Sequence, residues 1–370
     1  MRNRVFYALP ALAVCVGLAL QCIAATSSAA TTGGAKLASR ATIDAPSSAQ
    51  QEQQKDKKKE KKEKKEKPPT VPEPELKAAK AIEAAADVPA MLAAASEFLQ
   101  KYPKSPLRPQ IAPLVADRIG QVTDPAQRIT QIENYLKLFN APADAELVNQ
   151  HLLSAYTAAN RLDDAFALAQ NVADKSSDPL AAMISLTRAG LTEARNQNLK
   201  YVPPSRQMAL KAIALIESNK KPEAVSDATW NDYKTRWHWQ LHQWVAMLSL
   251  AAGDRADAKT RLATAVNLNP RDPINYVLLS TMANDEYQRL VQAHKAAAAG
   301  AEKDALLKRA EAQLDEVIDA YAHAVALTEG DAQYDTMRAG LRADLESYYK
   351  YRHNNSSDGL QALIDKYKKP

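Results

Sequence analysis

The residue types best suited to chemistry lie together in TWNDYKTRWHWQLHQW, residues 229–244, which hold all four tryptophans of the chain. This stretch also holds His238 and His242, four positions apart. On a helix two such residues share a face, so both imidazoles could reach one metal ion. A zinc or copper site needs a third ligand, and the sequence identifies none. We therefore predict no metal site and no cofactor.

The remaining sequence carries none of the common catalytic signatures. There is no G-x-x-x-x-G-K-[ST], no G-x-G-x-x-G and no G-x-S-x-G. His238 is followed by Trp239, so the histidine pair is not H-E-x-x-H, and no histidine has Glu three residues before it. We predict no catalytic residues and a protein that is not an enzyme. A metal-dependent enzyme that uses His238 and His242 is the least favoured alternative.

The tryptophans can be placed on a helix by angle. At about 100° per residue, three of them fall on one stripe, which we interpret as a core face: Trp230, Trp237 and Trp244. Trp239 falls about 180° away, and His238 and His242 lie between the two sides. We favour packing on both sides of this helix. The alternative is that Trp239, His238 and His242 line a groove for a partner, because Trp is enriched at binding hot spots.

The elements that would position these residues are predicted to be helices. From Glu75 onward the apolar residues are mostly Ala and Leu, which favour helices, and alternating runs of β-branched residues are missing. Asp-Pro pairs at 124–125, 178–179 and 272–273 predict helix starts, with Asp or the residue before it as cap and Pro in the first turn. We expect an all-α fold of about fourteen helices with short connections.

Two segments share a pattern of small and large apolar residues. In 253–273 a glycine turn precedes a small, a large and a small residue, spaced by four and three positions, and a proline ends the helix. In 152–179 a similar pattern runs over two helices. Small residues let paired helices approach, and the large residue fills the space between them. The positions that carry the pattern are Leu152, Tyr156, Ala165, Gly253, Ala258, Leu262, Ala265 and Pro270.

These segments resemble tetratricopeptide (TPR) repeats, 253–273 most closely. EFLQKYPKSPLRPQIA, residues 97–112, is similar to turns in TPR proteins of the bacterial envelope. Ala165 and Ala258 are 93 residues apart, which is not a multiple of the TPR period of about 34. The resemblance therefore implies degenerate repeats over 75–370: an α-solenoid of antiparallel helix pairs that binds a partner on its concave face.

The N-terminal residues predict export. Residues 1–30 combine a basic start, an apolar run and small residues, the layout of a signal peptide, and an uncleaved anchor at 5–25 is the alternative. Both cysteines, Cys15 and Cys22, lie there, so the exported chain would have no disulfide. Residues 31–74 are predicted to be a disordered tail, since 51–68 hold nine Lys, five acidic residues and nothing to bury.

Together these features predict a non-catalytic protein of the bacterial periplasm or cell envelope. We expect a scaffold or assembly factor that binds a protein or peptide segment. A glycan-binding or cell-wall-binding module, with sugar rings stacked on tryptophan, is the second hypothesis. No nucleic-acid partner is expected, because the positive charge lies in the tail and the helical part is slightly acidic. Residues 1–68 could associate with a membrane or envelope polymer.

Overall fold

The computed structural model describes residues 71–368, and the regular structure in this range is entirely helical, as expected for an all-α fold. The predicted signal peptide (1–30), the alternative anchor (5–25) and all but the last residues of the predicted tail (31–74) lie outside the described residues. A membrane-spanning helix is not found within 71–368, where no helix is both long and apolar enough.

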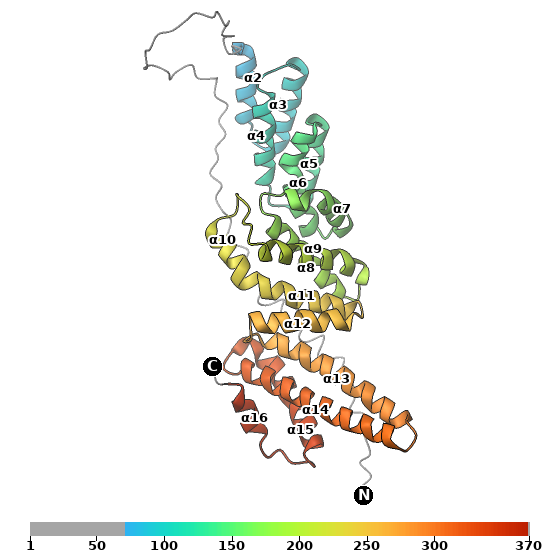
Figure 1. Cartoon of the computed structure of the whole chain (residues 1–370). Helices are drawn as coiled ribbons and strands as arrows, with labels where there is room; N and C mark the ends of the chain where they lie inside the picture. Colours follow the sequence, from blue (N-terminus) through green and yellow to red (C-terminus); the bar gives the residue numbers. More distant parts are fainter. Residues whose placement is uncertain (1–70, 369–370) are drawn as a thin grey trace, which may run out of the picture. The chain divides into compact units, whose positions relative to one another are not determined.

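The helices follow one another with short connections (Figure 1). A π-helix, η3 (Tyr233–Trp237), joins α10 to α11, and short 3₁₀ segments precede α9 and α15. In chain order the α-helices are α2 (Glu73–Glu83), α3 (Val88–Lys101), α4 (Arg108–Gly120), α5 (Pro125–Leu138), α6 (Pro142–Ala158), α7 (Leu162–Val172), α8 (Pro179–Arg195), α9 (Val202–Glu217), α10 (Asp227–Asp232), α11 (His238–Ala251), α12 (Arg255–Leu268), α13 (Pro273–Ala296), α14 (Ala301–Thr328), α15 (Asp335–Arg352) and α16 (Leu360–Lys366).

The predicted Asp-Pro helix starts are confirmed at the beginnings of α5, α8 and α13. In each case the aspartate carboxylate accepts a hydrogen bond from a backbone N–H in the first turn. The distances are 2.7 Å at Asp124, 3.1 Å at Asp178 and 3.2 Å at Asp272. The first N–H groups of a helix have no partner within the helix, so this cap and the preset backbone angle of proline fix where each helix begins.

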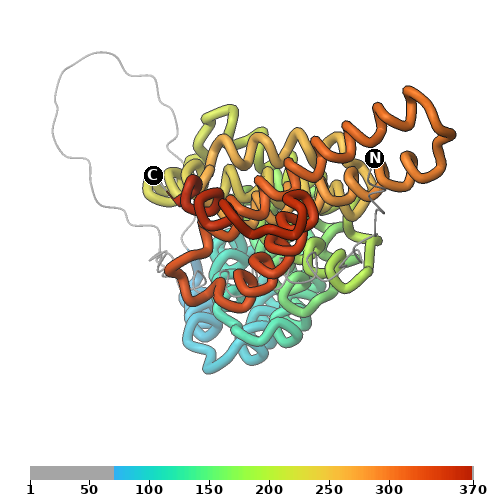
Figure 2. The backbone as a smooth tube through the Cα atoms, turned by 90° about the horizontal axis from the view of Figure 1, so that it is seen from below, coloured from blue at the N-terminus to red at the C-terminus, as the bar shows by residue number. Residues whose placement is uncertain are grey.

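The described part of the chain forms two compact units that divide within α8, between residues 182 and 183. In each unit helices pack mainly on their neighbours in the sequence. In the first unit the packed pairs include α2 with α3, α3 with α4, α5 with α6, and α6 with α7. In the second unit α11 packs on α9 and α12, and α14 packs on α13, α15 and α16. Figure 2 shows α13 and α14 side by side as a long hairpin.

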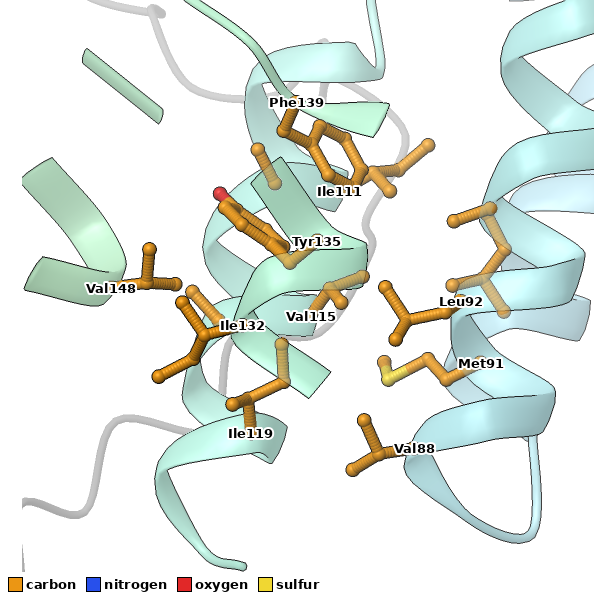
Figure 3. Packing of buried hydrophobic residues seen from close by; sticks show 14 of the residues in the cluster. Val88, Met91, Leu92, Ile111, Val115, Ile119, Ile132, Tyr135, Phe139 and Val148 are labelled. Atoms are coloured by element: carbon orange, nitrogen blue, oxygen red, sulfur yellow. The ribbon is translucent and has the colours of Figure 1, made fainter. Parts of the chain in front are cut away.

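The first unit has a continuous apolar core. Residues of α3 face residues of α4, α5 and α6 across it, and Figure 3 shows Val88, Met91, Leu92, Ile111, Val115, Ile119, Ile132, Tyr135, Phe139 and Val148. The rings of Tyr135 and Phe139 stack with centroids 4.7 Å apart, and the Tyr135 hydroxyl donates to the Asp144 carbonyl at 3.3 Å. This bond satisfies the one polar atom that Tyr135 brings into the core.

The repeat positions of α12 all lie in the core of the second unit. Ala258, Leu262 and Ala265 are fully buried. Gly253 forms the turn from α11 to α12 with φ of 79°, a left-handed conformation that glycine adopts without strain. Pro270 follows the end of α12, where it cannot extend the helix.

The repeat positions of the first unit lie on α6 and α7. Leu152 and Ala165 are buried, and Tyr156 is half-buried with the Arg161 guanidinium 4.6 Å above its ring. The small-large pattern therefore marks helix contact positions in both units.

A pair of leucines on α12 tests how much this contact stabilises the second unit. Leu262→Ala should lower the free energy of unfolding by about 2–5 kcal/mol, because it opens a cavity at a fully buried site. Leu268→Ala is the matched control, since Leu268 is 45% exposed, and should cost less than about 0.5 kcal/mol. Urea unfolding followed by tryptophan fluorescence measures both, because all four tryptophans lie in this unit. Equal losses would contradict the assigned packing.

Gly190 marks a close approach between α8 and α9. A Cβ atom at this position would lie 1.6 Å from the Ser205 Oγ, which is buried. Gly190→Ala should therefore destabilise the chain by about 1–3 kcal/mol through overpacking. The double variant with Ser205→Gly should recover most of this loss, since the obstructing hydroxymethyl group is gone. A double-mutant cycle of unfolding free energies measures the coupling, and additive effects would show that the helices do not meet here.

Candidate functional site

The tryptophan-histidine segment runs through α10, the π-helix and the start of α11, and α11 packs on α9. The Ser226 hydroxyl caps α10 by accepting from the Thr229 N–H at 3.1 Å. The His238 N–H donates to the Tyr233 carbonyl, five residues back. A π-helix has more residues per turn than an α-helix, so it rotates every later side chain relative to a regular helix.

The structure corrects one prediction for the tryptophans. Trp230 and Trp244 are buried, at 6% and 1% exposed, as expected for a core stripe. Trp237 was expected in the same stripe, but it is only half-buried, and its Nε1 donates to Asp232 at 3.1 Å. The prediction is wrong at Trp237, whose ring nitrogen instead bonds to a surface aspartate. Trp237 still meets Trp244 edge to face, with ring centroids 5.7 Å apart.

His238 and His242 lie beside Glu217, the last residue of α9. The Glu217 Oε1 is 3.5 Å from the His238 Nε2 and 3.6 Å from the His242 Nε2. The two imidazole rings are 5.3 Å apart and tilted by 54°. One ligand atom from each residue lies within 4.8 Å of the others. The helix pair thus brings two imidazoles and one carboxylate to one point.

His242 is the most deeply buried member of this group. Its side chain is 4% exposed, against 19% for His238 and 54% for Glu217. Neither ring nitrogen of His242 has a hydrogen-bond partner in the structure, and the His238 Nε2 also lacks one. Burial lowers the pKa of His242 to about 4, with smaller contributions from His238 and Arg261, while Glu217 opposes the shift. The His242 imidazole is therefore neutral at pH 7, and one of its two ring nitrogens carries a lone pair that can bind a ligand.

A positive charge that acts on His242 is paired with an acidic residue. Arg261 on α12 approaches His242, and its Nε donates to Asp257 Oδ1 at 3.3 Å. Asp257 also binds Arg206 of α9 at 2.9 Å and accepts from the Ser249 hydroxyl at 2.6 Å. These bonds tie α9, α11 and α12 together, and they hold the Asp257 carboxylate against both guanidinium groups.

Sequence reasoning missed Glu217 because it belongs to another helix. It precedes His238 by 21 residues, with a turn, α10 and the π-helix between them, and no motif has that spacing. Trp239, the third residue of the predicted groove, is half-buried and is not a member of the three-residue group. The structure therefore places His238 and His242 next to Glu217, with Glu217 and not Trp239 as the third member of the group.

A second feature is a cleft of about 750 Å³ in the same unit. It lies between the turn after α12, the carboxyl-terminal end of α14 and the end of α16. Its walls combine aromatic rings, small apolar residues and charged groups, namely Pro270, Arg271, Tyr276, His323, Ala326, Leu327, Glu329, Gly330, Tyr367 and Lys368. Trp239 does not line it.

Three stacked rings form one wall of this cleft. The His323 imidazole lies between the rings of Tyr276 and Tyr367, with centroid distances of 3.6 and 4.2 Å. The Tyr276 hydroxyl donates to the Pro270 carbonyl at 3.1 Å, and the Tyr367 hydroxyl is bonded to Asp319. These bonds fix the outer rings of the stack, so the wall is rigid. Its members are more than forty residues apart in the sequence, and no motif connects them.

Some charged groups of the cleft form ion pairs and others do not. Lys368 binds Glu329 at 2.5 Å and Asp365 at 2.7 Å. Arg271 is exposed, and its guanidinium has no ion-pair partner within residues 71–368. The cleft therefore offers one available cation next to a rigid aromatic wall.

Comparisons of the chain with known protein-family models, curated proteins and solved structures give no match. The features above are therefore interpreted from this chain alone.

His323 provides a test of the stacked wall by pH. Its pKa is lowered from the usual value mainly by burial, with Lys366 adding to the shift and Asp319 opposing it. The unfolded chain therefore binds this proton more readily than the folded chain, so stability is lost as pH falls through about 6.5 toward the lower folded pKa. We expect the free energy of unfolding to fall between about pH 7.5 and about pH 5.5, and to fall less for His323→Gln than for the unchanged chain. Urea unfolding at the two pH values measures both decreases. Equal losses would place His323 outside the wall.

Proposed function

We propose that this chain is a non-catalytic scaffold or assembly factor, which binds an extended segment of a partner protein. The support is the cleft lined by Tyr276, His323 and Tyr367 with Arg271 at its side. A rigid aromatic wall with a few polar groups is the usual composition of a site that anchors a side chain and orients its backbone.

The framework that carries this cleft suits such a role. Helices that pack mainly on their sequence neighbours build a surface from many side chains without a deep enclosed site. The buried small residues of α12 and the glycine turn before it are similar to a TPR helix pair. We therefore propose that each unit is built from degenerate TPR-like antiparallel helix pairs.

The chemistry of the cleft favours a partner segment that is partly apolar and partly acidic. Aromatic faces gain most from an apolar or aromatic side chain, which displaces water on both sides. The exposed guanidinium of Arg271 can hold a carboxylate with two parallel hydrogen bonds. A catalytic role is not proposed, because His323 is packed between two rings and Glu329 is bound to Lys368.

The place of action rests on the predicted signal peptide at 1–30. We propose export to the bacterial periplasm or cell envelope, with an anchor at 5–25 as the alternative. The lysine-rich and glutamate-rich stretch at 51–68 would then separate the helical units from an envelope attachment.

The experiment is affinity capture from an envelope extract with the purified chain and its variants. Arg271→Glu should reduce recovery of the partner by about tenfold or more, because a carboxylate in the partner would meet a like charge. Arg118→Glu is the control, since Arg118 is an exposed residue of α4 in the other unit. Captured proteins are quantified by mass spectrometry, and binding is repeated with a synthetic peptide from the main partner.

A third variant separates the cleft from the sequence-predicted groove. Trp239→Ala should leave recovery unchanged if the cleft is the binding site. If Trp239→Ala removes the partner and Arg271→Glu does not, the groove prediction is right and the cleft is not used. Quenching of tryptophan fluorescence by cell-wall fragments would instead favour the glycan-binding hypothesis.

A further inference from the structure

The group formed by Glu217, His238 and His242 has a property that packing does not explain. Both ring nitrogens of His242 and the Nε2 of His238 are buried without a hydrogen-bond partner. Unpaired buried polar atoms cost about 1–3 kcal/mol each, and a helix interface made for stability alone would carry apolar residues here. Three such atoms beside one carboxylate indicate a site whose natural partner is a ligand.

The neighbouring polar network shows the contrast. Gln243, next to His242 on α11, is also buried, but its amide donates to Asp272 at 3.0 Å and to Asn275 at 2.9 Å. Single buried atoms without a partner also occur in this unit, for example the Trp244 Nε1 and the Ser205 Oγ, but within residues 71–368 only His242 has two, and a third lies on His238 beside it. His242 is 4% exposed, and the acidic group beside it is the Glu217 carboxylate, 3.6 Å from its Nε2.

The donor set points to a particular class of ion. Two imidazole nitrogens and a carboxylate oxygen suit zinc, whereas calcium and magnesium prefer oxygen ligands only. At metal–ligand distances of about 2.0–2.1 Å, neighbouring ligand atoms of a tetrahedral zinc site are about 3.4 Å apart. The Glu217 oxygen lies 3.5 and 3.6 Å from the two Nε2 atoms. These two distances between ligand atoms are therefore already close to those of a tetrahedral zinc site.

We infer that Glu217, His238 and His242 form a zinc-binding site at the interface of α9 and α11. This differs from the sequence-based prediction of no metal site, which rested on the lack of an identifiable third ligand. The inference is independent of the proposed partner cleft, because the two features share no residue.

The local charges permit an ion at this point. Glu217 contributes one negative charge, and its side chain is more than half exposed, so the site can be reached from solvent. Arg261 opposes a cation, but it is bound to Asp257, which offsets its charge.

The π-helix before α11 acts as the positioning element. Its wide turn ends at His238, whose N–H bonds back to Tyr233, and so sets the angle at which the histidine face meets α9. His238 and His242 then follow the regular spacing of α11. Three protein ligands leave one tetrahedral position open for a water molecule or for a side chain of a partner.

Direct titration of the untagged, metal-stripped chain with zinc chloride tests this inference. Calorimetry should give one zinc per chain, and cobalt chloride should give the visible absorption of tetrahedral cobalt. Glu217→Gln should weaken zinc binding by at least about tenfold, and His242→Gln by about 100-fold. Glu217 is more than half exposed, so its variant keeps the fold even if a change at the buried His242 does not.

Two matched controls complete the test. Glu223→Gln removes an exposed carboxylate six residues along the chain, and His353→Ala removes an exposed histidine. Both should leave zinc affinity and stoichiometry unchanged. The inference is overturned if the unchanged chain binds no zinc, if Glu217→Gln binds as tightly as the unchanged chain, or if a control variant loses as much affinity as Glu217→Gln.

Discussion

The close contact of helix on helix is the interaction on which the described structure depends. Residues 71–368 contain no strand, and both cysteines of the chain lie before them, so neither a sheet nor a disulfide links distant segments there. Each helix must bury one face against its neighbours. Alanine at positions such as Ala258 and Ala265, both fully buried, brings the helix backbones close together. At Gly190 even a methyl group would be too large.

Between tightly packed helices, a buried polar atom without a hydrogen-bond partner is costly. In the second unit Gln243 bonds to Asp272 and Asn275, and Ser249 bonds to Asp257. These bonds connect successive helices and fix their register. His242 departs from this pattern, because its nitrogens are buried and unpaired. Three unpaired nitrogens on two adjacent histidines, next to the Glu217 carboxylate, therefore mark the candidate ligands of an ion.

Two functional proposals thus arise from two different kinds of surface in one unit. The cleft with Tyr276, His323 and Tyr367 is open, rigid and aromatic, which suits a segment of a partner protein. The group of Glu217, His238 and His242 is compact and mostly buried, which suits a single ion. A bound ion would also link α9 to α11, so it would stabilise the helix pair whether or not a partner is present.

The sequence by itself determined the class of fold and the places where helices begin. Alanine and leucine composition, scarce glycine and Asp-Pro pairs act locally, within one turn of the chain, so they can be recognised without a structure. The burial of Trp230 and Trp244 followed from periodicity for the same reason. Periodicity failed at Trp237, because its Nε1 has a hydrogen-bond partner, Asp232, at the surface, and burial also depends on which groups surround a helix position.

Only the tertiary structure decided which distant residues meet. Glu217 joins the histidine pair because α9 packs on α11, and His323 enters between Tyr276 and Tyr367 because α13, α14 and the end of α16 converge. Both arrangements depend on helix contacts across more than twenty residues of sequence, which neither periodicity nor a short motif encodes. The two histidines were recognisable as a pair from their spacing, but the residue that completes their site comes from the packing of another helix.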